Sequence, residues 1–544
     1  MTDLAASPLA KSLDELHPVA VKPKLDTKHD PFTILIFLGL LVGGVLYAGY
    51  SLYSDISRAD AQPTTFYPFL LLGIALFIAL AFEFVNGFHD TANAVATVIY
   101  THSLPPNFAV IWSGGFNFLG VLLSSGAVAF GIISLLPVEL ILQVGSEAGF
   151  AMVFALLIAA IMWNFGTWYL GLPASSSHTL IGSIIGVGLA NQLLATAGKG
   201  TSGVDWSQAL NVGNALLLSP IVGFVCAALL FLILKFIVRN PALYQEPKGS
   251  QPPPWWIRGL LVLTCTGVSF AHGSNDGQKG MGLIMLILIG TVPTAYALNR
   301  AMPESQIAQF DSASQAAMRV VEQKAAGYNV MGDPRPAVTA YVGSRTINEG
   351  TFPSLAALIG DISKQIKTYG SITRVPASAV GNTRNDMYLA SEAIRDLMKD
   401  KESDLSAEDK AALAQYKKAL DGATKFIPLW VKVVVAIALG LGTMIGWRRI
   451  VVTVGEKIGK THMTYAQGAS AELVAMSTIA AADMYGLPVS TTHVLSSGIA
   501  GTMAANGSGL QWATVRNIIL AWVLTLPAAI ILSGGLFVLF RHLF

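Results

Sequence analysis

The sequence predicts an all-α integral membrane protein, and three observations support this fold class. The chain of 544 residues has a mean hydropathy of +0.57 and only 12% charged residues, a balance typical of membrane proteins. It contains seven apolar stretches that reach the roughly 20 residues a helix needs to cross a bilayer. Two polar motifs interrupt the apolar sequence of the first half, and both recur in the same order in the second half.

The apolar stretches set the predicted order of the elements. The predicted spans lie at about 33–53, 67–86, 108–135, 150–170, 212–238, 427–446 and 515–540. The predicted organisation is a cytoplasmic tail, an extra N-terminal transmembrane helix, a first transmembrane repeat, the start of a second repeat, a polar insertion and the rest of the second repeat, at residues 1–32, 33–53, 67–238, 258–292, 293–427 and 428–544.

Polar residues interrupt the apolar sequence in four segments. We predict that 67–101 and 258–292 are broken helices, because Gly, Asn, Asp and His interrupt their apolar pattern. The segments 150–196 and 465–505 each predict either two full helices or one re-entrant hairpin with a Ser/Thr-rich tip. Both readings return the chain to its starting side of the membrane.

Short basic loops predict the orientation. The N-terminal tail and the loops at 235–258 and 447–464 are rich in Lys and Arg, so they are expected in the cytoplasm. The two repeats then enter the membrane from opposite sides, which is an inverted repeat, and the 293–427 insertion is expected in the periplasm. Within it, Ser406 and Asp409 predict a helix-starting capping box.

The first repeated motif places an aspartate inside the apolar sequence of each half. It reads NGFHDTANAVAT from residue 86 and HGSNDGQKGMG from residue 272, so Asp276 follows Asp90 by 186 residues. Ionisable side chains are costly in a bilayer and mark binding sites or pathways by default. A buried carboxylate must be paired, protonated or bound to a cation, so both aspartates are predicted to bind the coupling cation. Thr91, Asn93 and Asn275 can bridge this cation to an anion.

The second repeated motif places hydroxyl groups at two helix starts. It reads GLPASSSHTL from residue 171 and GLPVSTTHVL from residue 486. Pro173 and Pro488 suit the first turn of a new helix, whose free N–H groups and positive dipole end favour an anion. A donor-rich, charge-poor cage suits a tetrahedral oxyanion that must be released again. The hydroxyls that would line it are Ser175, Ser176, Ser177, Ser490, Thr491 and Thr492.

Other polar residues accompany the motifs. Lys279 stands where the first motif has Asn93, and it can neutralise Asp276 or add positive charge to the anion site. Glu472 lies in an apolar run before the last motif and is a further candidate for cation coupling. Four histidines flank the motifs and could relay protons, or be neutral hydrogen-bonding groups: His89, His178, His272 and His493.

The paired motifs together resemble the PiT family of inorganic phosphate transporters, over about 67–292 and 427–540. The run GTMIGWRR from residue 442 is also similar to that family. The Gln278–Lys279 variant and the large insertion look most like its proton-linked, low-affinity bacterial members. The resemblance implies symport of phosphate, often as a neutral metal–phosphate complex, by a homodimer in a bacterial inner membrane. Its motif positions map here onto Asp90, Thr91, Asn93, Ser175–Ser177, Asn275, Asp276 and Ser490–Thr492.

Two departures from the sodium-driven members favour protons as the coupling ion. Those members carry an acid where this chain has Asn117 and another where it keeps Glu472. One such acid is therefore missing, and Lys279 replaces an Asn in the second motif. Proton coupling is the prediction and sodium coupling the alternative, with no cofactor in either case.

Other functions remain as alternatives. A transporter of another tetrahedral oxyanion, arsenate or sulfate, would use a similar cage. An intramembrane metalloenzyme is disfavoured because the chain lacks an HExxH motif and a hydrolase does not need repeated hydroxyl clusters. A passive anion channel would have no need of paired aspartates. The net charge of +2 gives no argument for nucleic acid binding.

Overall fold

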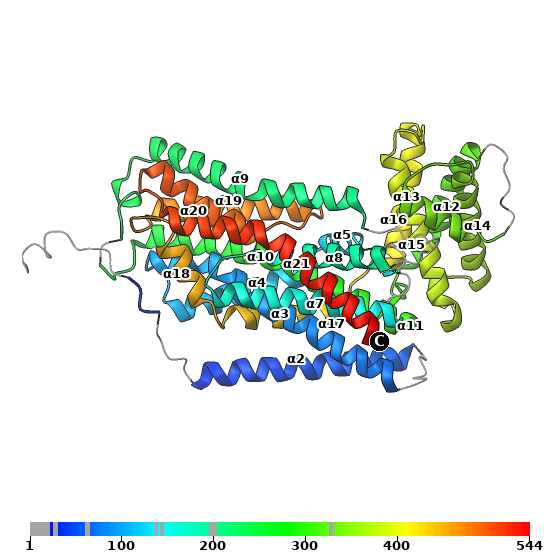
Figure 1. Cartoon of the computed structure of the whole chain (residues 1–544), viewed down its shortest axis with the longest axis horizontal. Coiled ribbons are helices and arrows are strands. Elements are labelled where there is room, and N and C mark those ends of the chain that lie inside the picture. The colour runs from blue at the N-terminus through cyan, green and yellow to red at the C-terminus, as the bar shows by residue number, and fades with distance from the viewer. Residues whose placement is uncertain are drawn as a thin grey trace, which may run out of the picture.

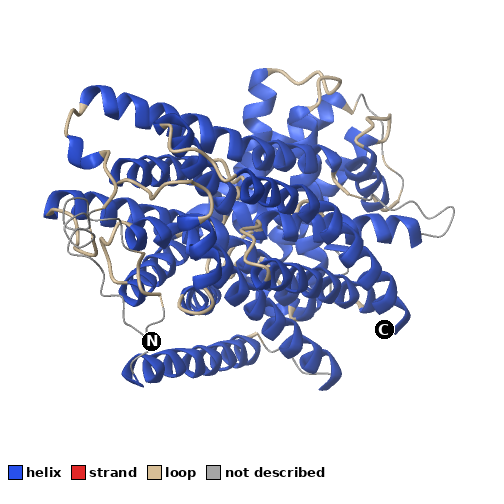
Figure 2. Ribbon diagram, turned by 60° about the vertical axis from the view of Figure 1, so that its left-hand side comes forward, coloured by secondary structure: helices blue, strands red, loops and turns tan. Residues whose placement is uncertain are grey.

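The described part of the chain is helical throughout its regular structure, which confirms the predicted fold class (Figure 2). The computed structural model describes residues 22–25, 31–59, 66–136, 140–141, 146–194, 204–247, 249–325, 330 and 332–543, except for the side chains of 66, 91–93 and 304–308. Most long helices run along the long axis of the molecule, and α12–α16 project from one end of this bundle (Figure 1).

The helices of the first half are α2 (Pro31–Arg58), α3 (Phe66–Tyr100), α4 (Pro106–Leu123), α5 (Ala127–Ile133), α7 (Glu147–Tyr169), α8 (Ser176–Leu194) and α9 (Trp206–Ile237), followed by the 3₁₀ helix η1 (Pro241–Leu243). Then come α10 (Trp255–Thr291) and α11 (Pro293–Tyr296). The insertion contains α12 (Glu304–Lys324), α13 (Arg335–Ser344), α14 (Thr351–Tyr369), η2 (Ile372–Arg374), α15 (Ala377–Lys399) and α16 (Ala407–Thr424). The last helices are α17 (Leu429–Thr443), α18 (Arg448–Glu456), α19 (Tyr465–Met484), α20 (Thr491–Asn506) and α21 (Trp512–Leu543).

Six of the seven predicted spans coincide with described helices that are long and apolar enough to cross a membrane: α2, α3, α4, α7, α9 and α21. The seventh is α17, which has 15 residues and turns by 74° away from α16. The predicted span at 108–135 is too long, because α4 ends at Leu123 and Gly126, with a φ of 88°, redirects the chain into α5.

The two predicted broken helices are in fact continuous. The helix α3 runs for 35 residues through the first aspartate motif, and α10 runs for 37 residues through the second. The polar side chains bond to neighbouring helices, so the backbone keeps its own hydrogen bonds, as a membrane interior requires. The prediction that 67–101 and 258–292 are broken helices is therefore wrong.

The two Ser/Thr motifs lie in matched helical hairpins. The helices α7 and α8 pack against each other, as do α19 and α20. Each hairpin turns at a glycine with positive φ, Gly171 at 68° and Gly486 at 65°. The chain then continues for four residues in each hairpin before α8 and α20 begin. The hydroxyl motifs consequently lie in the interior of the bundle and not at the hairpin tips.

Close glycine contacts lock four long helices into two pairs. A Cβ atom on Gly87 of α3 would lie 2.3 Å from the carbonyl oxygen of Leu439 in α17. One on Gly442 of α17 would lie 2.1 Å from the carbonyl oxygen of Phe84 in α3. Only glycine allows such an approach, and small residues are typical of helix contacts in membranes.

The pair α10–α4 repeats this contact at equivalent positions. A Cβ atom on Gly273 would lie 2.1 Å from the carbonyl oxygen of Asn117, and one on Gly120 would lie 2.1 Å from that of Phe270. Gly273 and Phe270 follow Gly87 and Phe84 by the same 186 residues that separate the motif aspartates. Each aspartate-bearing helix is thus packed on a helix of the other half. The hairpins follow the same rule, since α8 packs on α21 and α20 packs on α9.

We expect Gly273→Ala to lower the unfolding free energy by at least about 1–3 kcal/mol, the cost of overpacking a tight contact. The added methyl group would meet backbone at 2.1 Å, which cannot rotate away. The measurement is the thermal unfolding midpoint of the purified protein in detergent. Gly259→Ala in the same helix has nothing within 4 Å of the new Cβ and serves as the control. An unchanged midpoint for Gly273→Ala would contradict the packing described here.

The insertion is a helical unit tied to the membrane bundle at both ends of its chain. Its predicted capping box, Ser406 with Asp409, is confirmed at the start of α16. Where the chain enters and leaves the unit, Tyr296 Oη and Trp430 Nε1 both donate to Asp55 of α2, at 2.9 and 3.0 Å. The extra N-terminal helix is therefore fastened to the base of the insertion.

Candidate functional site

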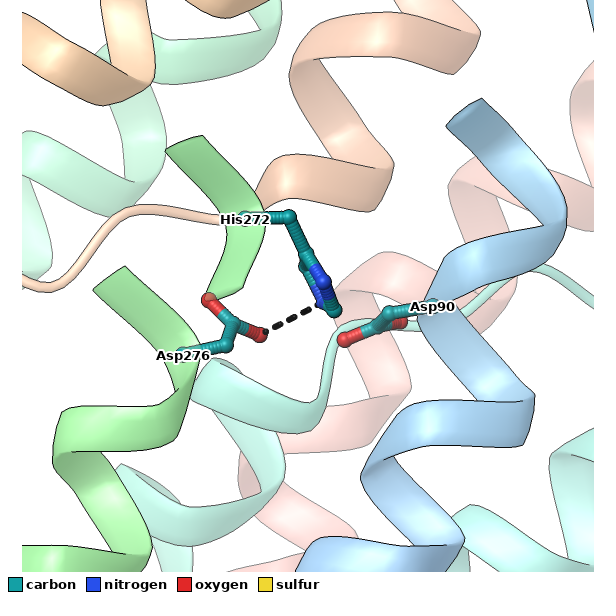
Figure 3. A group of neighbouring side chains, drawn as sticks. All are labelled: Asp90, His272 and Asp276. Carbon is teal, nitrogen blue, oxygen red and sulfur yellow. Dashed lines mark ion pairs between the residues drawn. The ribbon is translucent and has the colours of Figure 1, made fainter. Parts of the chain in front are cut away.

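The two motif aspartates lie close together in the centre of the bundle, on the adjacent helices α3 and α10. Ligand atoms of Asp90, His272 and Asp276 all lie within 4.8 Å of one another, and all three residues are buried. His272 points into the space between the two carboxylates (Figure 3). Two carboxylates and an imidazole at this spacing could hold a cation.

Asp90 is held from both halves of the chain. Thr492 of α20 donates its hydroxyl to Asp90 Oδ1 at 2.6 Å, and His89 Nδ1 lies 3.1 Å from the same oxygen. The other ring nitrogen of His89 lies 3.1 Å from Thr167 Oγ1 on α7. Nδ1 thus faces a carboxylate and Nε2 a hydroxyl, so His89 orients Asp90 and fixes its position against the first hairpin.

Asp276 is paired with a buried lysine. The ammonium group of Lys279 lies 2.7 Å from Asp276 Oδ1, and His272 Nε2 lies 3.5 Å from Oδ2. The same ammonium donates to Ser177 Oγ of α8 at 2.5 Å. His272 is positioned by its other nitrogen, which lies 2.8 Å from the amide oxygen of Asn117. Lys279 therefore neutralises Asp276, as one of the two sequence interpretations proposed, and also links it to a hairpin hydroxyl.

The first and third hydroxyls of each Ser/Thr motif have protein partners. Ser175 and Ser490 accept from the backbone N–H groups of His178 and His493, as helix N-caps do. Ser177 donates to the carbonyl oxygen of Val489 at 2.9 Å, which joins the two hairpins. The third hydroxyls thus bond to the other half of the chain. Ser177 accepts from Lys279, and Thr492 donates to Asp90.

The second hydroxyl of each motif is buried, and no described residue forms a hydrogen bond with it. Ser176 and Thr491 occupy the same position in the two copies, and neither oxygen has a hydrogen-bond partner among the described residues. A buried polar group without a partner costs about 1–3 kcal/mol, so two at equivalent positions mark a place for a polar ligand. Both belong to the first residues of a helix, where N–H groups and the dipole favour an anion.

Asn275 connects α10 to the second hairpin. Its amide nitrogen donates to the carbonyl oxygen of Leu487 at 3.1 Å, and its amide oxygen accepts from the N–H of Val489 at 3.4 Å. Both side-chain groups are thus engaged with the segment that precedes α20. In this structure Asn275 positions the second hydroxyl motif.

The two motif histidines of the hairpins form a ring pair. The centroids of His178 and His493 are 4.5 Å apart, and His493 stacks on Trp522 of α21 at 4.1 Å. Within the described residues, His178 Nδ1 and His493 Nε2 have no hydrogen-bond partner. The pair brings the starts of α8 and α20 together.

Glu472 lies apart from the aspartate cluster. Its carboxylate accepts from Thr97 of α3 and from Thr264 of α10, the latter at 2.5 Å. Thr97 is seven residues beyond Asp90, or about 10 Å along the helix. Glu472 therefore bridges the two aspartate-bearing helices at another level of the bundle.

The predicted and the observed site residues differ in two ways. Two predicted residues lie outside the described side chains, and two residues that contact the motif histidines were not predicted. The side chains of Thr91 and Asn93 lie outside the described residues. Thr167, which contacts His89, and Asn117, which contacts His272, were not among the predicted binding residues. Thr167 has no polar counterpart in the second hairpin, where Ala482 stands 315 residues later, so the repeat gave no signal for it.

Comparison with known proteins identifies the family of this chain. The model of the phosphate transporter family matches residues 86–533, which include both copies of both motifs. The chain belongs to the phosphate transporter family. Members of this family are transporters and not enzymes, which excludes the metalloenzyme considered from the sequence.

Relatives within the phosphate transporter family are similar over nearly their whole length. The low-affinity inorganic phosphate transporters PitA and PitB of Escherichia coli are 44% and 42% identical, over 86% and 87% of this chain and 96% and 97% of theirs. A solved structure, a sodium-dependent phosphate transporter, matches 87% of this chain and 100% of its own with 18% identity and a TM-score of 0.47.

Proposed function

We propose that this chain is a secondary active symporter that carries inorganic phosphate, coupled to protons, across a bacterial inner membrane. The observation that carries the proposal is the pair of buried, unpartnered hydroxyls on Ser176 and Thr491 at two helix starts. A tetrahedral oxyanion could accept from both hydroxyls and from the N–H groups beside them. The relatives named as phosphate transporters support phosphate as that anion.

Charge balance supports coupling to cations. The site holds two carboxylates, Asp90 and Asp276, and one ammonium group, Lys279. Phosphate adds at least one further negative charge, and buried charges must be compensated. An entering proton, or a divalent cation carried with phosphate and held by Asp90, His272 and Asp276, would supply the compensation. Sodium is the alternative coupling ion.

The exchanged packing of the helices supports an inverted repeat. Each aspartate-bearing helix contacts a helix of the other half through equivalent glycines, and each hairpin packs on the last long helix of the other half. Phosphate would bind between the two hairpin helix starts and the two aspartates. The homodimer implied by the family resemblance is part of the proposal and can be tested by light scattering in detergent.

The test is uptake of labelled phosphate into proteoliposomes with an imposed proton or sodium gradient. We expect accumulation with the proton gradient alone. Accumulation only with sodium would retain phosphate transport and overturn proton coupling. Failure to take up phosphate under either gradient would overturn the proposed function.

Competition against labelled phosphate tests the substrate. Arsenate, which is nearly isosteric with phosphate, is expected to inhibit uptake. Sulfate has no proton to donate at neutral pH and is expected to inhibit poorly. Stronger inhibition by sulfate than by arsenate would contradict the assignment.

A further inference from the structure

A third acidic side chain is buried near the site but takes no part in it. Glu83 lies on α3, seven residues before Asp90, and is 0% exposed. Asn86 and the backbone of Gly280 lie close to its carboxyl group, but neither carboxylate oxygen forms a hydrogen bond of standard geometry with a described residue. Burial without a bonded counter-charge makes the ionised form cost several kcal/mol, which favours the neutral, protonated carboxyl group.

The fold makes room for this carboxyl group against α10. A Cβ atom on Gly280 would lie 2.3 Å from Glu83 Cγ and 2.4 Å from its Oε1. The Glu83 side chain therefore packs directly on the α10 backbone, one residue after Lys279. Any larger residue at position 280 would displace the carboxyl group.

The strongest charges acting on Glu83 both come from α10. They are the ammonium group of Lys279 and the carboxylate of Asp276. Lys279 is bonded to Asp276 and to Ser177, so one ammonium serves a carboxylate and the hydroxyl motif at once. With Glu83 protonated, these three ionisable groups sum to zero, and with Glu83 ionised they sum to −1.

The other helices beside α3 bring few titratable groups. No such side chain is present in α4, and α17 carries only Lys432, which donates to the carbonyl oxygen of Ser124. Along α7 they occur only at the two ends, as Glu147 and Tyr169. The one on α8 is His178.

Three further helices bond to α3 beyond this level. The helices α20, α19 and α18 do so through Asp90, Thr97 and Tyr100, seven or more residues after Glu83. The titratable groups at these contacts are Asp90 and Tyr100 of α3 itself and the carboxylates of Glu472 and Glu456. The positive counter-charge available to an ionised Glu83 is therefore the ammonium group of Lys279.

We propose that Glu83 binds the proton that is transported with phosphate, an inference that rests on the proposed proton-coupled function. Glu83 takes a proton from water on the side where phosphate enters and holds it while Lys279 is paired with Asp276. When Lys279 turns from Asp276 towards Glu83, the carboxylate is stabilised and its proton leaves to water on the other side. One proton is bound and released in each cycle, and no other group changes its covalent state.

The decisive variant is Glu83→Gln, which keeps the size of the neutral acid but cannot ionise. In proteoliposomes we expect proton-driven accumulation to fall to the level reached without a gradient. Exchange of labelled for unlabelled phosphate at equal concentrations should persist, because it needs no net proton movement. Glu83→Asp, which remains ionisable, is expected to keep proton-driven accumulation. Glu147→Gln at the exposed start of α7 is the matched control and should behave like wild type.

The outcomes separate this inference from the proposed function. If Glu83→Gln still accumulates phosphate in response to a proton gradient, the inference is overturned while phosphate transport stands. If Glu83→Gln loses exchange as well, Glu83 serves binding or folding and the inference is also overturned. A second readout is the infrared carboxylic acid band of the purified protein at varied pH, which should lose one buried component in Glu83→Gln. Wild-type protein that transports no phosphate would instead overturn the proposed function.

Discussion

We expect the initial rate of phosphate uptake to fall by on the order of 100-fold or more in each of the variants Asp90→Asn and Asp276→Asn. Removing one partner of a buried charge interaction costs about 3–5 kcal/mol, and about 1.4 kcal/mol corresponds to a factor of ten. Both aspartates are buried and face the same space beside His272. The measurement is the initial rate of labelled phosphate uptake in proteoliposomes of matched protein content.

A matched control separates loss of function from loss of fold. Asp276→Asn leaves the buried ammonium of Lys279 without its counter-charge, so this variant should also be less stable than Asp90→Asn. Combining it with Lys279→Gln should restore the unfolding midpoint but not the uptake. Uptake at the wild-type rate by either single variant would contradict the assignment of the aspartates to the transport site.

Replacing the two unpartnered hydroxyls should weaken phosphate binding without weakening the fold. For Ser176→Ala and Thr491→Val we expect the half-saturating phosphate concentration to rise by roughly 10- to 100-fold each, since a hydrogen bond to a charged ligand contributes about 1.5–3 kcal/mol. The unfolding midpoint should stay the same or rise, because neither hydroxyl has a partner among the described residues.

The chain offers a control in the same helix. Ser183 is also buried in α8, but its hydroxyl donates to the carbonyl oxygen of Thr179 within that helix at 2.8 Å. Ser183→Ala should leave the half-saturating concentration unchanged. Equal effects of Ser183→Ala and Ser176→Ala would mean that Ser176 does not contact phosphate.

The sequence alone predicted those features that depend on composition and on repetition. Six apolar stretches predicted spanning helices because hydrophobic length is what a bilayer requires. The equal spacing of the motifs predicted that Asp90 and Asp276 would be counterparts, and the structure brings them together. Pro173 and Pro488 predicted helix starts beside the hydroxyls, and α8 and α20 do begin at Ser176 and Thr491. The prolines themselves lie three residues before these starts and not in the first turn.

Features that depend on contacts between distant segments could not be predicted. Glycines in the aspartate motifs suggested broken helices, whereas Gly87 and Gly273 allow a neighbouring backbone to approach. A glycine has the same appearance in a sequence whether it serves a bend or a contact. Glu472 was grouped with the aspartates because it is an intramembrane acid, but its partners on α3 and α10 place it elsewhere. Only the fold shows which buried acids share a site.

The reciprocal glycine contacts constrain how the two sides of the membrane could be opened in turn. At Gly87, Gly442, Gly120 and Gly273 main chain rests on main chain, so no rotamer can absorb sliding between these helices. Because each contact joins the two halves of the chain, the halves cannot rock against each other as separate bodies. The hairpins are held in the same way, since a Cβ atom on Gly186 of α8 would lie 2.2 Å from the carbonyl oxygen of Ile530 in α21, and one on Gly501 of α20 would lie 2.2 Å from that of Phe224 in α9. Any alternating opening must therefore carry each hairpin together with the long helix of the other half on which it packs.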